Sequence, residues 1–220
     1  MTAFDTALFL GLPHATITLA SASVTRQNIL RAAGVDFNVA PTAIDEARVR
    51  ADAQAGDMAA DEIAVLLAFL KAQAASQILL PTQSPTNSSY IIGCDQLLLI
   101  DDHIMAKPVS LTEAKQQLLM LAGKQHGLLS AIVLIRDGQR IWHHLGRAAL
   151  TMRKFDDAFA DAYIQRIGEA ALWSPGAYQI ESFGSSLFAR IDGDHFDILG
   201  LPLLPLLGIL HEHGLRPLEA

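Results

Sequence analysis

Two hydroxyl side chains and one arginine lie where a predicted strand gives way to a predicted helix. Ser21, Ser23 and Arg26 follow the short β-branched run 16–20 (TITLA) and open a helical pattern. The N-terminus of a helix presents unpaired N–H groups and the positive end of the helix dipole, so these residues suit a phosphate group. Ordinary N-capping by a serine, with Arg26 in solvent, accounts for the same residues and is the simpler local interpretation.

Acidic and basic side chains elsewhere could complete a site for such an anion. Asp45 and Glu46 follow a predicted strand, and Asp95 lies inside the apolar run YIIGCDQLLLI. An unpaired buried carboxylate is costly, so Asp95 should either have a partner or face a cleft. Lys71 lies on an apolar predicted helix, where by itself it would be a lysine that extends its ammonium to the surface. Lys107 directly precedes a proline.

The composition excludes several classes of protein. The chain has 220 residues, of which 51% are hydrophobic, a net charge of −7 and one cysteine, Cys94. The apolar fraction excludes a disordered chain, the single cysteine excludes a disulfide scaffold, and the acidic charge argues against binding to nucleic acid. The sequence has no GxGxxG, Walker A or GxSxG motif, and its histidines lack metal-site spacing. The apolar segment 200–210 is too short to span a bilayer, so we expect no membrane partner.

The apolar pattern predicts an α/β fold that must position these residues. The predicted strands are 16–20, 35–40, 90–100, 128–135, 141–152 and 177–191, and the predicted helices are 21–33, 58–76, 111–121, 156–167 and a last helix after Gly200. A hairpin turn at 136–138 favours a mixed twisted sheet with flanking helices over an all-parallel one. We expect a single domain over 1–220, with 1–15 as an N-terminal extension and 80–89 as a surface loop.

Seven short segments, taken in order along the chain, resemble the Maf family of nucleoside triphosphate pyrophosphatases. The segments are LASASVTRQNILRAAGVDFNVAPTAIDE (19–46), LAFLKA (67–72), IIGCDQ (91–96), AKP (106–108), AGKQH (122–126), GAYQIESFG (176–184) and IDGDHFDILGLPL (191–203). Each segment is weak evidence by itself, but together they extend over almost the whole chain. The sequence is therefore identified as a member of this family.

The resemblance implies a fold, an activity and a cofactor. The fold would be an elongated, two-lobed α/β molecule around a deep cleft, of the Maf/ITPase-like type, and commonly a homodimer. The enzyme would be cytoplasmic and would use a divalent metal (Mg²⁺, Mn²⁺ or Co²⁺) to cleave a nucleoside triphosphate to the monophosphate and pyrophosphate. A triphosphate carries about four negative charges near neutral pH, so an acidic chain must gather cations locally and recruit a metal.

The resemblance also implies roles for individual residues. The triphosphate would be held by Ser21, Ser23 and Arg26. The catalytic residues would be Asp95, Glu46, Lys71 and Lys107, with Asp95 and Glu46 as the acidic, metal-binding centre. Asp95 stands in the place of the family's proton acceptor, and a positioned water would attack the α-phosphorus in line with departing pyrophosphate. Whether Asp95 deprotonates the water or holds the metal stays open at this point.

Departures from the family pattern concern the choice of substrate. Thr25, in Val24-Thr25, falls where the family has Pro-Arg, so one phosphate-side cation is missing. Gln96 and Glu181 are the residues of the branch that resembles 7-methyl-GTP pyrophosphatases. Methylation gives the guanine base a positive charge, and Glu181 could accept its N–H groups while favouring that charge. That branch usually has an aromatic residue at the position of Thr25, and threonine cannot stack on a base.

Two other functions remain possible from the sequence. The first is a nucleotide-binding regulator of cell division with little or no turnover, because the family is associated with restraint of septum formation. The second is a degenerate nucleotide binder, because Thr25 and Ala106 both alter the phosphate end of the family pattern.

Overall fold

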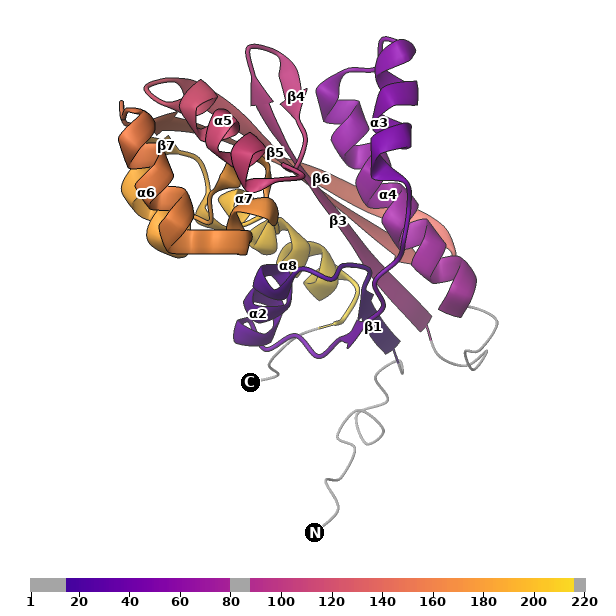
Figure 1. Ribbon diagram of the computed structural model, residues 1–220. Helices are drawn as coiled ribbons and strands as arrows, with labels where there is room; N and C mark the ends of the chain where they lie inside the picture. Colours follow the sequence, from indigo (N-terminus) through magenta and orange to yellow (C-terminus); the bar gives the residue numbers. More distant parts are fainter. Residues whose placement is uncertain (1–14, 80–87, 216–220) are drawn as a thin grey trace. The chain divides into compact units, whose positions relative to one another are not determined.

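A computed structural model describes residues 15–79 and 88–215, which form an alternation of strands and helices (Figure 1). The strands are β1 (Ala15–Leu19), β2 (Asn38–Val39), β3 (Ser88–Ile100), β4 (His103–Met105), β5 (Gln125–Arg136), β6 (Gln139–Met152) and β7 (Phe188–Asp192). The α-helices are α2 (Val24–Ala32), α3 (Glu46–Ala55), α4 (Ala60–Leu79), α5 (Leu111–Leu121), α6 (Asp157–Ile167), α7 (His195–Ile198) and α8 (Leu203–Glu212). The described residues also form the short 3₁₀ helices η2 (Gly168–Leu172), η3 (Pro175–Ala177) and η4 (Phe183–Leu187).

Within the described residues, seven strands join one mixed sheet. Its order is β2-β1-β3-β5-β6-β7, and β4 pairs with β3 off this path. β1 pairs in parallel with β2 and β3, whereas the pairs β3–β4 and β6–β7 are antiparallel. Asp137 and Gly138 join β5 to β6 and both have positive φ, as a type I′ hairpin turn requires. The predicted mixed α/β fold is confirmed, while the elongated shape and the cleft stay predictions.

The chain divides into two compact units. Unit 1 contains residues 15–79, 88–95, Ala131–Leu145 and 201–215, and unit 2 contains Gln96–Ser130 and Gly146–Gly200. Three strands, β3, β5 and β6, each contribute residues to both units. The prediction of one domain over 1–220 stays a prediction.

α4 is the core helix of unit 1. Among the described helices it alone is long and apolar enough to cross a membrane, judged by length and composition. Its alanines instead pack against the sheet: a Cβ added at Gly93 of β3 would lie 2.1 Å from the Ala68 carbonyl oxygen and 2.7 Å from the Ala72 Cβ. Only a glycine allows this close approach of helix and strand. The helix therefore belongs to the buried core of this unit, beside large side chains such as Leu67 and Ile91.

Unit 2 has a separate core between its strands and two helices. The core holds Leu98, Leu118, Leu150, Tyr163 and Tyr178, among others. α5 and α6 pack side by side (Figure 1). The α5 residue Lys115 lies 2.8 Å from Asp157 and 2.7 Å from Asp161, both on α6, and so joins the two helices. The predicted helix 111–121 is confirmed in full, and the predicted helix 156–167 begins one residue later than expected.

A buried histidine makes the stability of unit 2 depend on pH. His126 is 3% exposed, its Nε2 lies 2.8 Å from the Tyr178 hydroxyl, and its Nδ1 is buried without a partner among the described residues. Burial lowers the pKa of His126 to about 4, from 6.5. The unfolded chain therefore takes up a proton at a higher pH than the folded chain does, and stability is lost as the pH falls from 6.5 towards 4.

Replacing this histidine should flatten the acid side of the stability profile. At pH 4 we expect His126 to lower the free energy of unfolding by about 3 kcal/mol relative to its value at pH 7. His126→Gln, which cannot titrate, should lose that part of the pH dependence. Urea unfolding at pH 7 and pH 4 measures it, with His103→Gln, at an exposed position, as the control. Equal pH dependence of the wild type and His126→Gln would contradict the assignment.

The predicted strand 177–191 is wrong over most of its length. Only Phe188–Asp192 is a strand; Ala177 ends η3, residues 178–182 are irregular or turn, and residues 183–187 form η4. Three serines explain the difference, because the hydroxyls of Ser182, Ser185 and Ser186 each donate to a carbonyl three residues earlier. Such local bonds compete with strand pairing and favour turns.

Two other boundaries also differ from the prediction. The predicted strand 35–40 pairs only over Asn38–Val39, and this short strand β2 is an edge strand with β1 as its one neighbour among the described strands. The predicted loop 80–89 lies outside the described residues up to 87, and Ser88 and Ser89 already pair with β1 as the start of β3. The predicted N-terminal extension 1–15 also lies outside them, apart from Ala15.

Candidate active site

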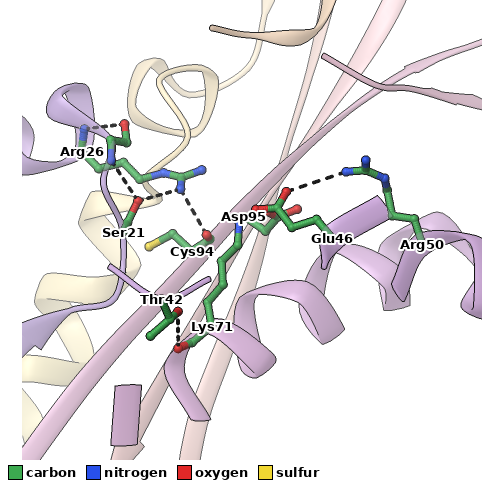
Figure 2. Close-up of polar contacts among 9 residues, drawn as sticks. Ser21, Arg26, Thr42, Glu46, Arg50, Lys71, Cys94 and Asp95 are labelled. Atoms are coloured by element: carbon green, nitrogen blue, oxygen red, sulfur yellow. Dashed lines mark hydrogen bonds and ion pairs between the residues drawn. The ribbon is translucent and has the colours of Figure 1, made fainter. Parts of the chain in front are cut away.

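α2 begins at the serine-rich junction. Ser23 is the N-cap, and its Oγ accepts a hydrogen bond from the Arg26 backbone N–H at 3.3 Å. The Arg26 side chain turns back towards β3, where its Nη1 donates to Ser21 Oγ at 3.2 Å and to the Cys94 carbonyl at 3.1 Å (Figure 2). The capping interpretation therefore holds for Ser23, but Arg26 is not a solvent arginine. Thr25 lies half-buried in the first turn.

Lys71 joins two carboxylates in unit 1. Its Nζ lies 2.5 Å from Asp95 Oδ1 and 2.8 Å from Glu46 Oε1 (Figure 2). The side chains of Lys71 and Asp95 are 12% and 5% exposed, so water screens this ion pair weakly. Glu46 is more open, with 37% of its side chain exposed. Three residues predicted from separate motifs thus meet at one point, from α3, α4 and β3.

Ordinary local structure positions these side chains. Glu46 is the first residue of α3, and the N-cap Asp45 accepts a hydrogen bond from a first-turn backbone N–H at 3.0 Å. One turn further on, Arg50 Nη1 lies 3.8 Å from Glu46 Oε2. The Thr42 hydroxyl donates to the Lys71 carbonyl at 3.1 Å, which ties the segment before α3 to α4.

Asp95 has one carboxylate oxygen to spare. Its Oδ1 accepts the bond from Lys71, while its Oδ2 is buried and has no hydrogen-bond partner among the described residues. Desolvation raises the pKa of Asp95 above its ordinary value, against the opposing charges of Lys71 and Arg26. A positioned carboxylate with a raised pKa and an unused oxygen can accept a proton from a nearby water.

The neighbouring Cys94 does not provide a nucleophile. The residue is fully buried, and desolvation raises the pKa of its thiol to about 11. A thiol is nucleophilic only as the thiolate, so Cys94 stays inert near neutral pH. Its predicted place in the core is confirmed.

The acidic pair fits a divalent cation only if the substrate supplies further ligands. The part of the chain that the structure describes has no cluster of three or more His, Cys, Asp or Glu side chains suited to a metal. Mg²⁺ is usually held by one or two carboxylates together with water and substrate phosphates. The unpartnered Oδ2 of Asp95 and the nearby Glu46 meet that need.

Three further predicted residues belong to unit 2. Lys107 and Glu181 are exposed, and Gln96 is half-buried. Gln96 donates from its amide nitrogen to Ser130 Oγ and to the carbonyls of Asp197 and Ile198. The contact of Gln96 with Ser130 was not foreseen, because a lone serine in an apolar strand gives no signal of its partner.

Comparisons with known proteins decide the family. A model of the family described as Maf-like protein matches residues 16–213. The chain belongs to the Maf family. A nucleoside triphosphate pyrophosphatase of Rhodospirillum rubrum is 45% identical over 198 residues, which is 90% of this chain and 95% of the relative. A 7-methyl-GTP pyrophosphatase of Brucella abortus is 43% identical over 194 residues, 88% of this chain and 94% of the relative. A nucleoside triphosphate pyrophosphatase of Caulobacter vibrioides is 45% identical over 198 residues, which is 90% of this chain and 96% of the relative.

Membership of the Maf family confirms the predicted resemblance and enzyme class. The roles of individual residues in this Maf chain stay predictions, although the unit 1 geometry brings Glu46, Lys71 and Asp95 together as those roles require. Sequence reasoning missed Arg50 and Thr42, which hold Glu46 and Lys71. The four-residue spacing of Glu46 and Arg50 would have indicated a helical ion pair had α3 been predicted.

Proposed function

We propose that this chain hydrolyses a nucleoside triphosphate to the monophosphate and pyrophosphate, with Asp95 as the proton acceptor. The observation that carries the proposal is the buried Asp95 carboxylate, with one oxygen on Lys71 and the other without a partner among the described residues. The activities named for the Rhodospirillum and Caulobacter relatives support the same reaction.

The reaction balances with water as the only co-reactant. The water oxygen forms a bond to the α-phosphorus, and the bond from that phosphorus to the oxygen bridging to the β-phosphorus breaks. Pyrophosphate leaves with that bridging oxygen and its electron pair. The proton of the water passes to Asp95, whose raised pKa brings it nearer to the pH at which the enzyme works.

The other unit 1 residues handle charge. Glu46 and the substrate phosphates would hold a divalent cation, which leaves the spare oxygen of Asp95 for the proton; the cation would neutralise phosphate oxygens and polarise the α-phosphorus. Lys71 holds the two carboxylates in place and offsets part of their charge. Arg26 and Ser21, at the start of α2, are proposed to bind the phosphate chain together with Ser23 and the helix N-terminus.

The predicted site residues of unit 2 are proposed to contact the substrate. Lys107 would add positive charge for the triphosphate. Glu181 and Gln96 would read the base, and a positively charged 7-methylguanine would favour the carboxylate of Glu181. The Brucella relative, named a 7-methyl-GTP pyrophosphatase, supports this preference. Thr25 argues for a weaker preference for 7-methyl-GTP, because a threonine side chain cannot stack on the base. We also propose a cytoplasmic homodimer.

A nucleotide panel tests the reaction and the preference together. Purified protein should release pyrophosphate from nucleoside triphosphates when Mg²⁺, Mn²⁺ or Co²⁺ is present, and chelation by EDTA should abolish the release. Release from 7-methyl-GTP should be faster than from UTP or dTTP. Equal rates with all three would contradict the base preference alone, whereas no metal-dependent release from any nucleotide would contradict the reaction.

A further inference from the structure

The amide of Gln96 is held in one orientation. Its Nε2 lies 2.9 Å from Ser130 Oγ, 3.0 Å from the Ile198 carbonyl and 3.1 Å from the Asp197 carbonyl. Carbonyl oxygens can only accept hydrogen bonds, so the NH₂ side of the amide must face them. A flipped amide would place Oε1 against two other oxygens and lose every one of these bonds.

Ser130 strengthens this choice. The residue is fully buried in β5, and its hydroxyl donates to the Asp197 carbonyl at 2.5 Å. Because its one proton is used there, Ser130 Oγ can only accept from Gln96. The three groups therefore form a hydrogen-bonded chain of fixed direction. The Gln96 amide donates to the Ser130 hydroxyl, which in turn donates to the Asp197 carbonyl.

The acceptor end of this chain is itself fixed. The N-cap Asp194 of α7 accepts from the backbone N–H of Asp197 at 3.3 Å. A Cβ added at Gly146 of β6 would lie 2.1 Å from the Asp197 carboxyl carbon, so Asp197 packs directly on that glycine. The Asp197 carbonyl cannot easily move away from Gln96.

We infer that Ser130, together with the carbonyls of Asp197 and Ile198, is a positioning residue that fixes Gln96 as a hydrogen-bond acceptor, so that the enzyme selects bases that present a ring N–H. With its NH₂ group committed, Gln96 has only Oε1 to offer a ligand. Guanine and uracil present a ring N–H at the edge where adenine and cytosine present an acceptor nitrogen. The inference rests on the proposed function, in which Gln96 contacts the base.

Binding without turnover tests it. The probes are the α,β-methylene analogues of UTP and CTP, which differ at the ring nitrogen but match in size, and those of GTP and ATP. Calorimetry should show the wild type binding the N–H member of each pair about tenfold more tightly, an affinity ratio of about ten. The other member of the pair would place its acceptor ring nitrogen against the acceptor Oε1 of Gln96. In Ser130→Ala the amide loses one of its three acceptors and keeps the two carbonyls, so the ratio should fall in part, to roughly threefold.

A double-mutant cycle separates positioning from a general loss of structure. Gln96→Leu should also lower the ratio, and Ser130→Ala should change the ratio no further in that background. Ser76→Ala is the matched control, since Ser76 is a buried serine whose hydroxyl has no partner among the described residues. It should leave the ratio unchanged.

Each other outcome overturns the inference. These are a wild type that does not discriminate, a ratio unchanged by Ser130→Ala, equal weakening of all four analogues, or an effect of Ser130→Ala that persists in Gln96→Leu. Failure of the proposed reaction looks different, because a wild type that discriminates among the analogues without releasing pyrophosphate from any nucleoside triphosphate contradicts the reaction alone. If no analogue binds, the inference is wrong, and the nucleotide panel decides on the reaction separately.

Discussion

Asp95→Asn is expected to lower the rate of pyrophosphate release about 10³-fold. The asparagine keeps the size of the side chain and one carbonyl oxygen for Lys71, but it cannot accept the proton of an attacking water. Its second group is an NH₂ donor at the place where the wild type has the unpartnered Oδ2. The defect should therefore appear mainly in kcat, with KM for the nucleotide changed little.

The control for this variant is Asp101→Asn. Asp101 lies in the turn between β3 and β4 with φ near 49°, a conformation that asparagine tolerates, and 77% of its side chain is exposed. That variant should keep wild-type turnover. An Asp95→Asn protein with more than a tenth of wild-type turnover would contradict the role of proton acceptor. If Asp95→Asn loses turnover but keeps the full effect of the wild type on cell division, the result favours the nucleotide-binding regulator.

Gly93→Ala is expected to destabilise unit 1 by about 3 kcal/mol or more. The new methyl group would lie 2.1 Å from the Ala68 carbonyl oxygen and 2.7 Å from the Ala72 Cβ, both on α4. These atoms belong to a helix backbone and a short side chain that cannot turn aside, so α4 must move away from β3. Because Lys71 precedes Ala72, the displaced helix should also weaken the ion pair with Asp95 and lower turnover.

Urea unfolding of the wild type, Gly93→Ala and Gly208→Ala measures this effect. Gly208 lies in α8, and a Cβ added there meets nothing within 4 Å. Gly208→Ala should raise stability by up to about 1 kcal/mol, because alanine has the higher helix propensity. If Gly93→Ala unfolds within 1 kcal/mol of the wild type, the close packing of α4 on β3 is wrong.

The elements with strong local patterns could be predicted from sequence. The helix 111–121 has apolar residues at helical spacing and a serine N-cap, and the Asp137-Gly138 turn has the residues that positive φ requires. The helix α3 lacks such a strong local pattern. It buries only Ala53, so its sequence shows no apolar stripe.

The site was predictable in part for a related reason. Asp95 stands out because a carboxylate within an apolar strand needs a partner, and the family resemblance placed Lys71 and Glu46 beside it. Nothing in the sequence indicated that Arg26 would bond the Cys94 carbonyl, or that Gln96 would bond those of Asp197 and Ile198. Backbone carbonyls are present at every residue and carry no sequence signal, so only the fold determines which of them a side chain meets.

The weak burial of α3 has a consequence for how the site responds to its ligand. An isolated helix of ten residues is marginal in water, and α3 adds little apolar burial to offset this. Its ion pairs through Glu46 add to the contacts that keep it folded, and the free energy for opening it locally should be small. A ligand that engages Glu46 would draw on its own binding energy to order α3. The affinity measured for that ligand would then be the intrinsic affinity reduced by the fraction of molecules in which α3 is open.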